Sequence, residues 1–123
     1  MVVVITLLAG ALGAVARYGV TLAFARTPAR LPLAVLIVNV VGSFIGGGVV
    51  GLVSAGVIGA DIRLILLSGL AGGLTTFSTF GVETVQLIRE SRLWTAALSV
   101  VLNLVLGITA ALVGYSLGAL VTP

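Results

Sequence analysis

The chain has 123 residues, of which 60% are apolar and only 7% are charged. Ordinary soluble domains carry about 25% charged residues, so this composition excludes a soluble globular protein. Histidine, cysteine and lysine are absent, which excludes His-based catalytic triads, His/Cys metal sites and disulfides. The six arginines are scattered and do not form the basic face of a nucleic-acid-binding protein. The three carboxylates have no evident partner for acid/base catalysis, so we expect no enzyme.

Runs without charge divide the chain into four segments that are each long enough to cross a membrane. Residues 31–60, 64–82 and 93–123 carry no charge, and residues 1–25 contain only Arg17. A bilayer core of about 30 Å needs about 20 helical residues. We therefore expect an all-α membrane protein that forms a single domain with four transmembrane helices. The expected spans are 2–24, 33–54, 63–87 and 95–119.

The first span places Arg17 well inside the membrane. An arginine near the bilayer centre costs about 2.5–3.5 kcal/mol on insertion scales, so its charge needs compensation. Two interpretations stay open. Arg17 either extends toward the interface near Tyr18 and Arg26, or it lines an aqueous vestibule and attracts an anion.

The second span carries Asn39 and, four residues later on the same helical face, Ser43. An unpaired amide in hydrocarbon costs several kcal/mol, so Asn39 must face a partner helix or water. Its carboxamide has two N–H donors. Hydrogen bonding between helices and binding of a small anion are therefore both open.

Glycines recur at the spacing that lets membrane helices approach closely. They are Gly42, Gly46, Gly47, Gly51, Gly69, Gly73, Gly114 and Gly118. We expect most of them to serve only the packing of helices within one bundle.

The third span is crowded with glycines and hydroxyls between Gly69 and Phe80. Glycine costs about 1 kcal/mol relative to alanine inside a helix, and Thr or Ser hydroxyls can satisfy freed backbone groups. This composition predicts a break between Gly72 and Ser78. Broken membrane helices expose carbonyl oxygens near the midplane, where channels and transporters bind ions.

Aromatic and polar residues continue beyond the expected break. Phe77 and Phe80 are three residues apart and share one side if the helix resumes there. Their positive ring edges could contact an anion, although ordinary packing is the alternative interpretation. In the fourth span, Ser99, Asn103 and Gly107 recur at four-residue intervals, which indicates a polar track.

Three stretches of the chain resemble the Fluc/CrcB fluoride channels of microbes. They are Gly13-Ala14 with Arg17-Tyr18, then Asn39-Val40-Val41-Gly42-Ser43-Phe44, then Gly72-Gly73-Leu74-Thr75-Thr76-Phe77-Ser78-Thr79-Phe80 followed by Glu83. Their order and their placement in the spans also match, and the resemblance covers essentially the whole chain.

This resemblance implies a four-helix subunit that pairs with a second subunit in antiparallel orientation. The dimer would export fluoride passively through two pores across an inner, or plasma, membrane. Backbone carbonyls of Gly72 and Thr75 would bind a structural sodium ion at the dimer centre. The resemblance, together with the polar spacing, assigns to the fluoride pore Arg17, Asn39, Ser43, Phe77, Ser78, Thr79, Phe80 and Asn103.

Charge at the span borders bears on the orientation and on the second subunit. The first and third connections carry Arg26, Arg30, Arg89 and Arg92, whereas only Arg63 borders the other side. The positive-inside rule favours the first and third connections in the cytoplasm. A subunit that inserts in both orientations should have a smaller bias, so a second copy and an oppositely oriented paralogue are both open as partners.

Two rival functions remain. A small four-span proton-coupled drug transporter needs a carboxylate in the membrane, for which Glu83 is the candidate. A non-conducting packing subunit would explain the glycines but would leave Asn39, the broken span and the phenylalanine pair without a role.

Overall fold

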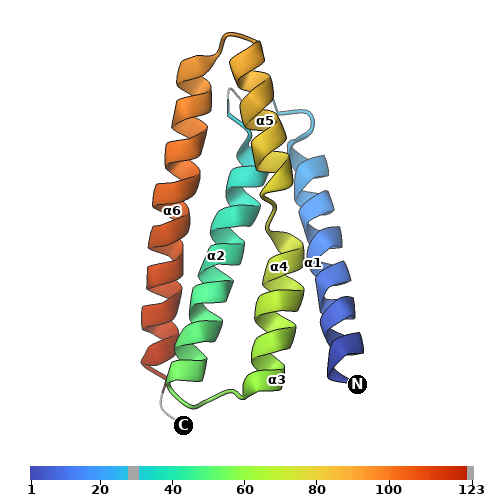
Figure 1. The fold of residues 1–123 in the computed structure, drawn as a ribbon, viewed down its shortest axis with the longest axis vertical. Coiled ribbons are helices and arrows are strands. Elements are labelled where there is room, and N and C mark those ends of the chain that lie inside the picture. The colour runs from blue at the N-terminus through green and yellow to red at the C-terminus, as the bar shows by residue number, and fades with distance from the viewer. Residues whose placement is uncertain (28–30, 122–123) are drawn as a thin grey trace.

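The computed structural model describes residues 1–27 and 31–121, which form a bundle of long helices (Figure 1). Four helical segments are long and apolar enough to cross a membrane, and no strand occurs within the described ranges. The expected all-α membrane fold is thereby confirmed. The elements are α1 (Val2–Phe24), α2 (Leu33–Ser54), α3 (Ala60–Arg63), the π-helix η1 (Leu64–Ala71), α4 (Gly72–Leu74), α5 (Ser78–Arg89) and α6 (Leu93–Ala119).

Successive segments run in opposite directions along the bundle (Figure 1). The start of α1 and the end of α6 therefore lie at one end, and the α5–α6 turn lies at the other. Helix α2 packs along α6, while α1 packs along η1 and α4. Arg89 ends α5 and Arg92 precedes α6, so both lie at that turn. The connection after α1, which contains Arg26, lies at the same end of the bundle (Figure 1), whereas Arg30 falls outside the described residues.

Large apolar side chains cover the outside of the bundle instead of filling its centre. Leu7, Leu8, Leu104 and Leu112 are each more than half exposed. The buried apolar core is small and consists of Val35, Val38, Val49, Ala71, Leu74, Leu87 and Ala96. This distribution suits a surface that faces lipid.

Glycines bring the backbones of α2 and α6 into direct contact. A methyl group at Gly47 would collide with the carbonyl of Ala111, and one at Gly114 would collide with the backbone of α2. Gly51 and Gly118 meet backbone atoms of the opposite helix in the same way. In lipid, helices associate through such close van der Waals packing because no hydrophobic force drives them together. The expected packing role of these four glycines is confirmed.

A second glycine contact joins α1 to the third segment. Methyl groups at Gly13 and Gly73 would each collide with a backbone carbonyl of the opposite helix. One at Gly69 would lie 2.7 Å from the carbonyl oxygen of Thr6. The bundle is thus built from two helix pairs, each held by glycines at its contact.

The third segment departs from α-helical geometry twice. Residues 64–71 form a π-helix, which the pattern of apolar residues did not predict. The chain then leaves helical geometry at Thr75, which is extended (φ −73°, ψ 156°), and resumes as α5 at Ser78. This interruption lies inside the predicted interval of Gly72 to Ser78, so the expected break is confirmed.

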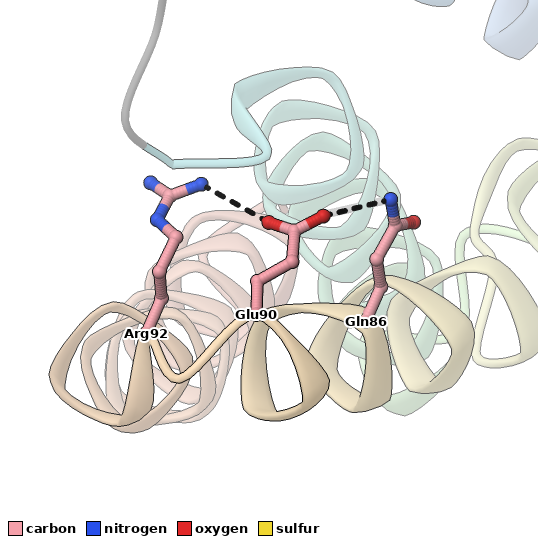
Figure 2. A network of polar contacts seen from close by, with 3 residues as sticks. All are labelled: Gln86, Glu90 and Arg92. Atoms are coloured by element: carbon pink, nitrogen blue, oxygen red, sulfur yellow. Dashed lines mark hydrogen bonds and ion pairs between the residues drawn. The ribbon is translucent and has the colours of Figure 1, made fainter.

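A backbone motif and a small polar network shape the α5–α6 turn (Figure 2). Gln86 Nε2 donates to Glu90 Oε1 at 3.2 Å, and Arg92 Nη1 lies 3.8 Å from Glu90 Oε2. Ser91 has a φ of 59°, and the Arg92 N–H donates to the Leu87 carbonyl at 2.8 Å. This is the Schellman pattern that ends helices. Because exposed ion pairs contribute little, the backbone motif is the main determinant of the turn.

The glycine contacts generate a stability prediction with a matched control. Gly47→Ala places a methyl group against the Ala111 carbonyl, so the free energy of unfolding should fall by about 1–3 kcal/mol. Gly19→Ala, where an added methyl meets nothing within 4 Å, should be neutral or stabilising because alanine favours helix. Unfolding in mixed detergent micelles measures both variants. Equal stability of the two would contradict the packing described for α2 and α6.

Candidate functional site

The carboxamide of Asn39 on α2 takes over the backbone hydrogen bonds that are lost at the break. Its Oδ1 accepts the Thr76 N–H at 2.9 Å, and its Nδ2 donates to the Thr76 carbonyl at 3.2 Å. One side chain therefore satisfies both backbone groups of one residue. An unsatisfied backbone group in a bilayer costs several kcal/mol, so this pairing is what allows the third segment to unwind inside the membrane.

Asn39 also connects the break to α6. Its Nδ2 donates to Oδ1 of Asn103 at 3.1 Å, and Asn103 Nδ2 donates in turn to the Ser99 carbonyl at 2.9 Å. The chain has only two asparagines, and they are hydrogen-bonded to each other across 64 positions of sequence. Asn103 and Ser99 thus form a polar line on the face of α6 that meets α2, which fits the expected track.

Thr76 is a central residue of this site that the sequence analysis did not select. It is 6% exposed, and its hydroxyl accepts the Thr79 N–H at 3.2 Å and donates to Thr79 Oγ1 at 3.0 Å. Thr79 lies in the first turn of α5, whose N-cap residue is Phe77, so the Thr76 hydroxyl caps one of the N–H groups that have no partner inside that helix. The signal was a threonine placed just before the point where the helix resumes. Three neighbouring residues also carry hydroxyls, and spacing alone did not distinguish Thr76 from Thr75, Ser78 or Thr79.

Arg17 reaches the break from α1. Its Nη1 donates to the carbonyl of Thr75 at 3.2 Å. Its side chain also borders a cavity of about 260 Å³, together with Tyr18, Thr76 and Thr79. The charge of Arg17 therefore has an acceptor inside the bundle and a polar space beside it.

The break changes the partners of both carbonyls that the resemblance assigns to sodium. Because the Thr76 N–H donates to Asn39, it does not donate to the carbonyl of Gly72 four residues earlier. The carbonyl of Thr75 accepts Arg17, but a carbonyl oxygen has a second lone pair. Unwound backbone carbonyls are the groups that coordinate sodium in membrane transporters. The donor set therefore fits such an ion, with the nearby positive charge of Arg17 opposing it.

An open groove of about 580 Å³ lies between α2, the third segment and α6. Ser43, Gly72 and Thr75 line it among small and apolar residues. Ser43 faces α6 here, because a methyl group at Gly107 would lie 3.5 Å from its Oγ. The structure thus places Ser43 in the groove, while Asn39, one turn away, points to the break.

Phe77 and Phe80 lie on one side of the third segment, as their spacing predicts. Their ring centroids are 6.0 Å apart and the rings are tilted by 50°. Phe77 is 84% exposed, and Ser78 and Thr79 beside it are exposed as well. Within this single chain, the ring edges at the break are thus available to another molecule.

Glu83 follows Phe80 by one helical turn on α5. Its Oε2 is the one buried side-chain oxygen or nitrogen that has no hydrogen-bond partner in the described part of the chain. Two small cavities, of about 300 and 200 Å³, border Glu83 near Leu31 and Pro32. Glu83 is therefore a further candidate functional residue, in addition to the residues that the sequence assigned to the pore.

The cap formed by Thr76 generates a prediction that separates its hydroxyl from its shape. Thr76→Val keeps the volume but removes the acceptor for the Thr79 N–H, so stability should fall by about 1 kcal/mol. Thr76→Ser keeps the hydroxyl and should retain the cap. Unfolding in detergent measures the three proteins. A valine variant as stable as the starting protein would show that α5 does not depend on this cap.

Comparison with known proteins agrees with the motifs along the chain. Residues 4–115 match the family described as CrcB-like protein, Camphor Resistance (CrcB). A relative from Renibacterium salmoninarum is 43% identical and covers 97% of this chain and 100% of its own length. A relative from Shewanella amazonensis is 42% identical over 88% of both chains, and one from Pyrococcus horikoshii is 34% identical over 94% of both. Each of these relatives is named a fluoride-specific ion channel FluC. With matches of this extent, the chain belongs to the CrcB-like family.

Proposed function

We propose that this chain is a subunit of a fluoride-selective channel through which fluoride leaves the cell passively. The observation that carries the proposal is the break in the third membrane segment, where the Asn39 amide, Asn103 and the phenylalanine pair gather. The names of the relatives, fluoride-specific ion channels, support the same ion.

The chemistry of the site favours an anion. Amide N–H groups donate hydrogen bonds, aromatic ring edges carry positive partial charge, and the Arg17 guanidinium adds a full positive charge. Fluoride is small and strongly hydrated, so it gives up water only where close donors replace it. A narrow path would disfavour chloride by its size and by its weaker hydrogen bonds.

The proposed path passes the break on the side of the phenylalanine pair. Phe77 and Phe80 would present their ring edges, with Asn39 and Asn103 as amide donors. Arg17 would attract fluoride into the cavity that its side chain borders. The remaining proposed contacts are Ser43, Ser78 and Thr79.

The exposure of this region supports a second subunit. Phe77 is 84% exposed and the glycine-lined groove is open, which leaves the site incomplete in one chain. We propose an antiparallel dimer with two pores, in the inner membrane. The partner is either a second copy of this chain or an oppositely oriented paralogue. The paralogue is considered because the arginines near the α5–α6 end favour one orientation of this chain.

A sodium ion at the dimer centre is part of the same proposal. The carbonyl of Gly72, released by the Thr76–Asn39 bond, and the carbonyl of Thr75 would hold it, with the same two groups from the second subunit. When bound, the ion would offset the repulsion between the partial negative charges of the carbonyl oxygens that converge there, and so join the two broken segments. Arg17 would hold the Thr75 carbonyl in position beside it.

One observation favours a second candidate function. The buried, unpaired Oε2 of Glu83 is a carboxylate oxygen of the kind that a proton-coupled drug transporter requires. Transport of a cationic drug that depends on a proton gradient, and that is lost in Glu83→Gln, would support this candidate. A packing subunit would pass neither ion nor drug.

The direct test is efflux from liposomes that contain the purified chain. We expect rapid fluoride efflux and no chloride efflux, because the hydrogen-bond donors at the break suit the smaller anion, which accepts stronger hydrogen bonds. Ion-selective electrodes measure both. Absence of fluoride efflux, with this chain alone and with an opposite-orientation paralogue added, would contradict the proposal.

Two substitutions test the proposed path. Asn39→Ala removes the amide at the break, and Phe80→Ile removes a ring edge, so each should abolish fluoride efflux. Size-exclusion chromatography should show that assembly is retained, and Gly19→Ala serves as a control with normal efflux because its methyl meets nothing within 4 Å. Normal efflux in either test variant would remove that residue from the path.

A further inference from the structure

We propose that the outer face of α5, next to the α5–α6 turn, binds a membrane phospholipid whose headgroup carries a primary amine, as in phosphatidylethanolamine. An open cleft of about 470 Å³ lies there, and we call it the α5 cleft. It is lined by four residues of α5 and by its C-cap residue, namely Val82, Val85, Gln86, Arg89 and Glu90. The lipid phosphate would meet Arg89, the ammonium would meet Glu90, and an acyl chain would lie along the two valines. This inference does not depend on the proposed function, because it concerns only a surface that faces lipid.

The α5 cleft has its apolar and polar groups in the same order as a phospholipid. Val82 and Val85 form the apolar part and are 67% and 56% exposed. Arg89 follows Val82 by seven residues, which is about 10 Å along a helix. The membrane-spanning part of the third segment also ends at Arg89. The polar part of the cleft therefore lies at the depth of the headgroups, and the apolar part lies at the depth of the acyl chains.

The only tryptophan of the chain supports this depth. Trp94 lies in the first turn of α6, directly after the α5–α6 turn, and is 82% exposed. Tryptophan rings are enriched where a membrane meets water, because one part of the ring is apolar and its N–H is polar. Trp94 therefore indicates that the α5–α6 turn lies among the headgroups.

The Arg89 guanidinium is available to a phosphate. It is exposed, and it forms no ion pair or hydrogen bond with any residue in the described part of the chain, 1–27 and 31–121. A guanidinium can donate two parallel hydrogen bonds to the oxygens of one phosphate. Arginines at the end of a membrane helix lie where phospholipid headgroups are concentrated. A lipid phosphate is therefore the nearest anion that Arg89 can bind.

Glu90 favours a headgroup that adds a positive charge to the phosphate. Its Oε1 accepts Gln86 Nε2 at 3.2 Å, and Arg92 Nη1 lies 3.8 Å from its Oε2, which is too far for a hydrogen bond (Figure 2). A carboxylate has about four lone-pair sites, so Glu90 can accept further donors. A lipid whose headgroup is only negative would be repelled by this carboxylate, whereas a headgroup with both charges would meet a partner for each.

A primary ammonium fits Glu90 better than a quaternary one. A primary ammonium has three N–H donors, whereas the trimethylammonium group of a choline lipid has none. The phosphate and the ammonium are neighbours in an ethanolamine headgroup, as Arg89 and Glu90 are neighbours in the chain. The two opposite charges of the α5 cleft therefore match phosphatidylethanolamine.

The second subunit proposed above would leave the α5 cleft open to lipid. Arg89 follows Phe80 by nine residues, or about two and a half helical turns, so the two side chains lie on opposite sides of α5. The open groove that suits a second subunit is lined by α2, α6 and the third segment up to Thr75, and by no residue of α5, all of which is described. The lipid and the second subunit would thus occupy different faces.

Native mass spectrometry of the full chain tests the proposal directly. The purified protein in detergent is incubated with equal amounts of phosphatidylethanolamine, phosphatidylcholine and phosphatidylglycerol that have identical acyl chains. We expect phosphatidylethanolamine to be retained about threefold to fivefold more often than either of the others, which is the size of effect expected of one exposed ion pair. Equal retention of the three lipids, or a preference for phosphatidylglycerol, would overturn the proposal.

Three substitutions locate the lipid. Glu90→Gln keeps the size of the side chain but removes its charge, so the preference for phosphatidylethanolamine should disappear. Arg89→Gln removes the partner of the phosphate, so retention of all three lipids should fall. Arg63→Gln changes an exposed arginine near the other end of the third segment and is the matched control, in which retention and preference should stay unchanged. A preference that survives Glu90→Gln, or retention that survives Arg89→Gln, would show that the lipid does not bind in the α5 cleft.

Fluorescence of Trp94 provides a second measurement that needs no substitution. The chain is placed in phosphatidylcholine bilayers that contain a small fraction of lipid with brominated acyl chains, which quench tryptophan on contact. Brominated phosphatidylethanolamine should quench Trp94 more strongly than brominated phosphatidylcholine at the same fraction, because the α5 cleft collects it beside the α5–α6 turn. Equal quenching by the two lipids would overturn the proposal.

Discussion

A backbone group that leaves its helix inside a bilayer must find a partner within the protein, because lipid offers none. The arrangement around residue 76 is a solution to this constraint. Asn39 accepts the Thr76 N–H and donates to its carbonyl, so the third segment can unwind without burying unpaired groups. Two other polar contacts complete the break. Arg17 donates to the carbonyl of the preceding residue, Thr75, and the Thr76 hydroxyl accepts the Thr79 N–H in the first turn of α5.

Glycine contacts and amide hydrogen bonds have different roles in the bundle. Glycines hold α2 to α6, and α1 to the third segment, through backbone contacts that carry no polar chemistry. The amides of Asn39 and Asn103 join α2, α6 and the break at one level. The glycine contacts therefore set the distance between helices, and the amides set their register at the depth where the site lies.

Much of this fold could be predicted from the sequence, because lipid imposes simple rules. Charge-free runs located the four spans, and the glycines and hydroxyls of residues 69–80 located the break. The π-helix was not predicted, since apolar residues that face lipid on most sides show no clear period. The Asn39–Asn103 contact also requires knowing that α2 pairs with α6, which the glycine spacing allows but does not specify. The role of Thr76 depends on the direction of the chain at the break, and residue type alone does not reveal that.

The pairing of Asn39 with the break has a consequence for biosynthesis. The third segment is the least apolar of the four, and on its own its open backbone would face lipid without a partner. Asn39 lies on the segment synthesised immediately before it, and Asn103 on the one synthesised after it. A translocon that released each segment singly would expose the break before its partner is docked. Release of the second and third segments as a hairpin would avoid this exposure, and the fourth segment would complete the polar contacts when it joins them.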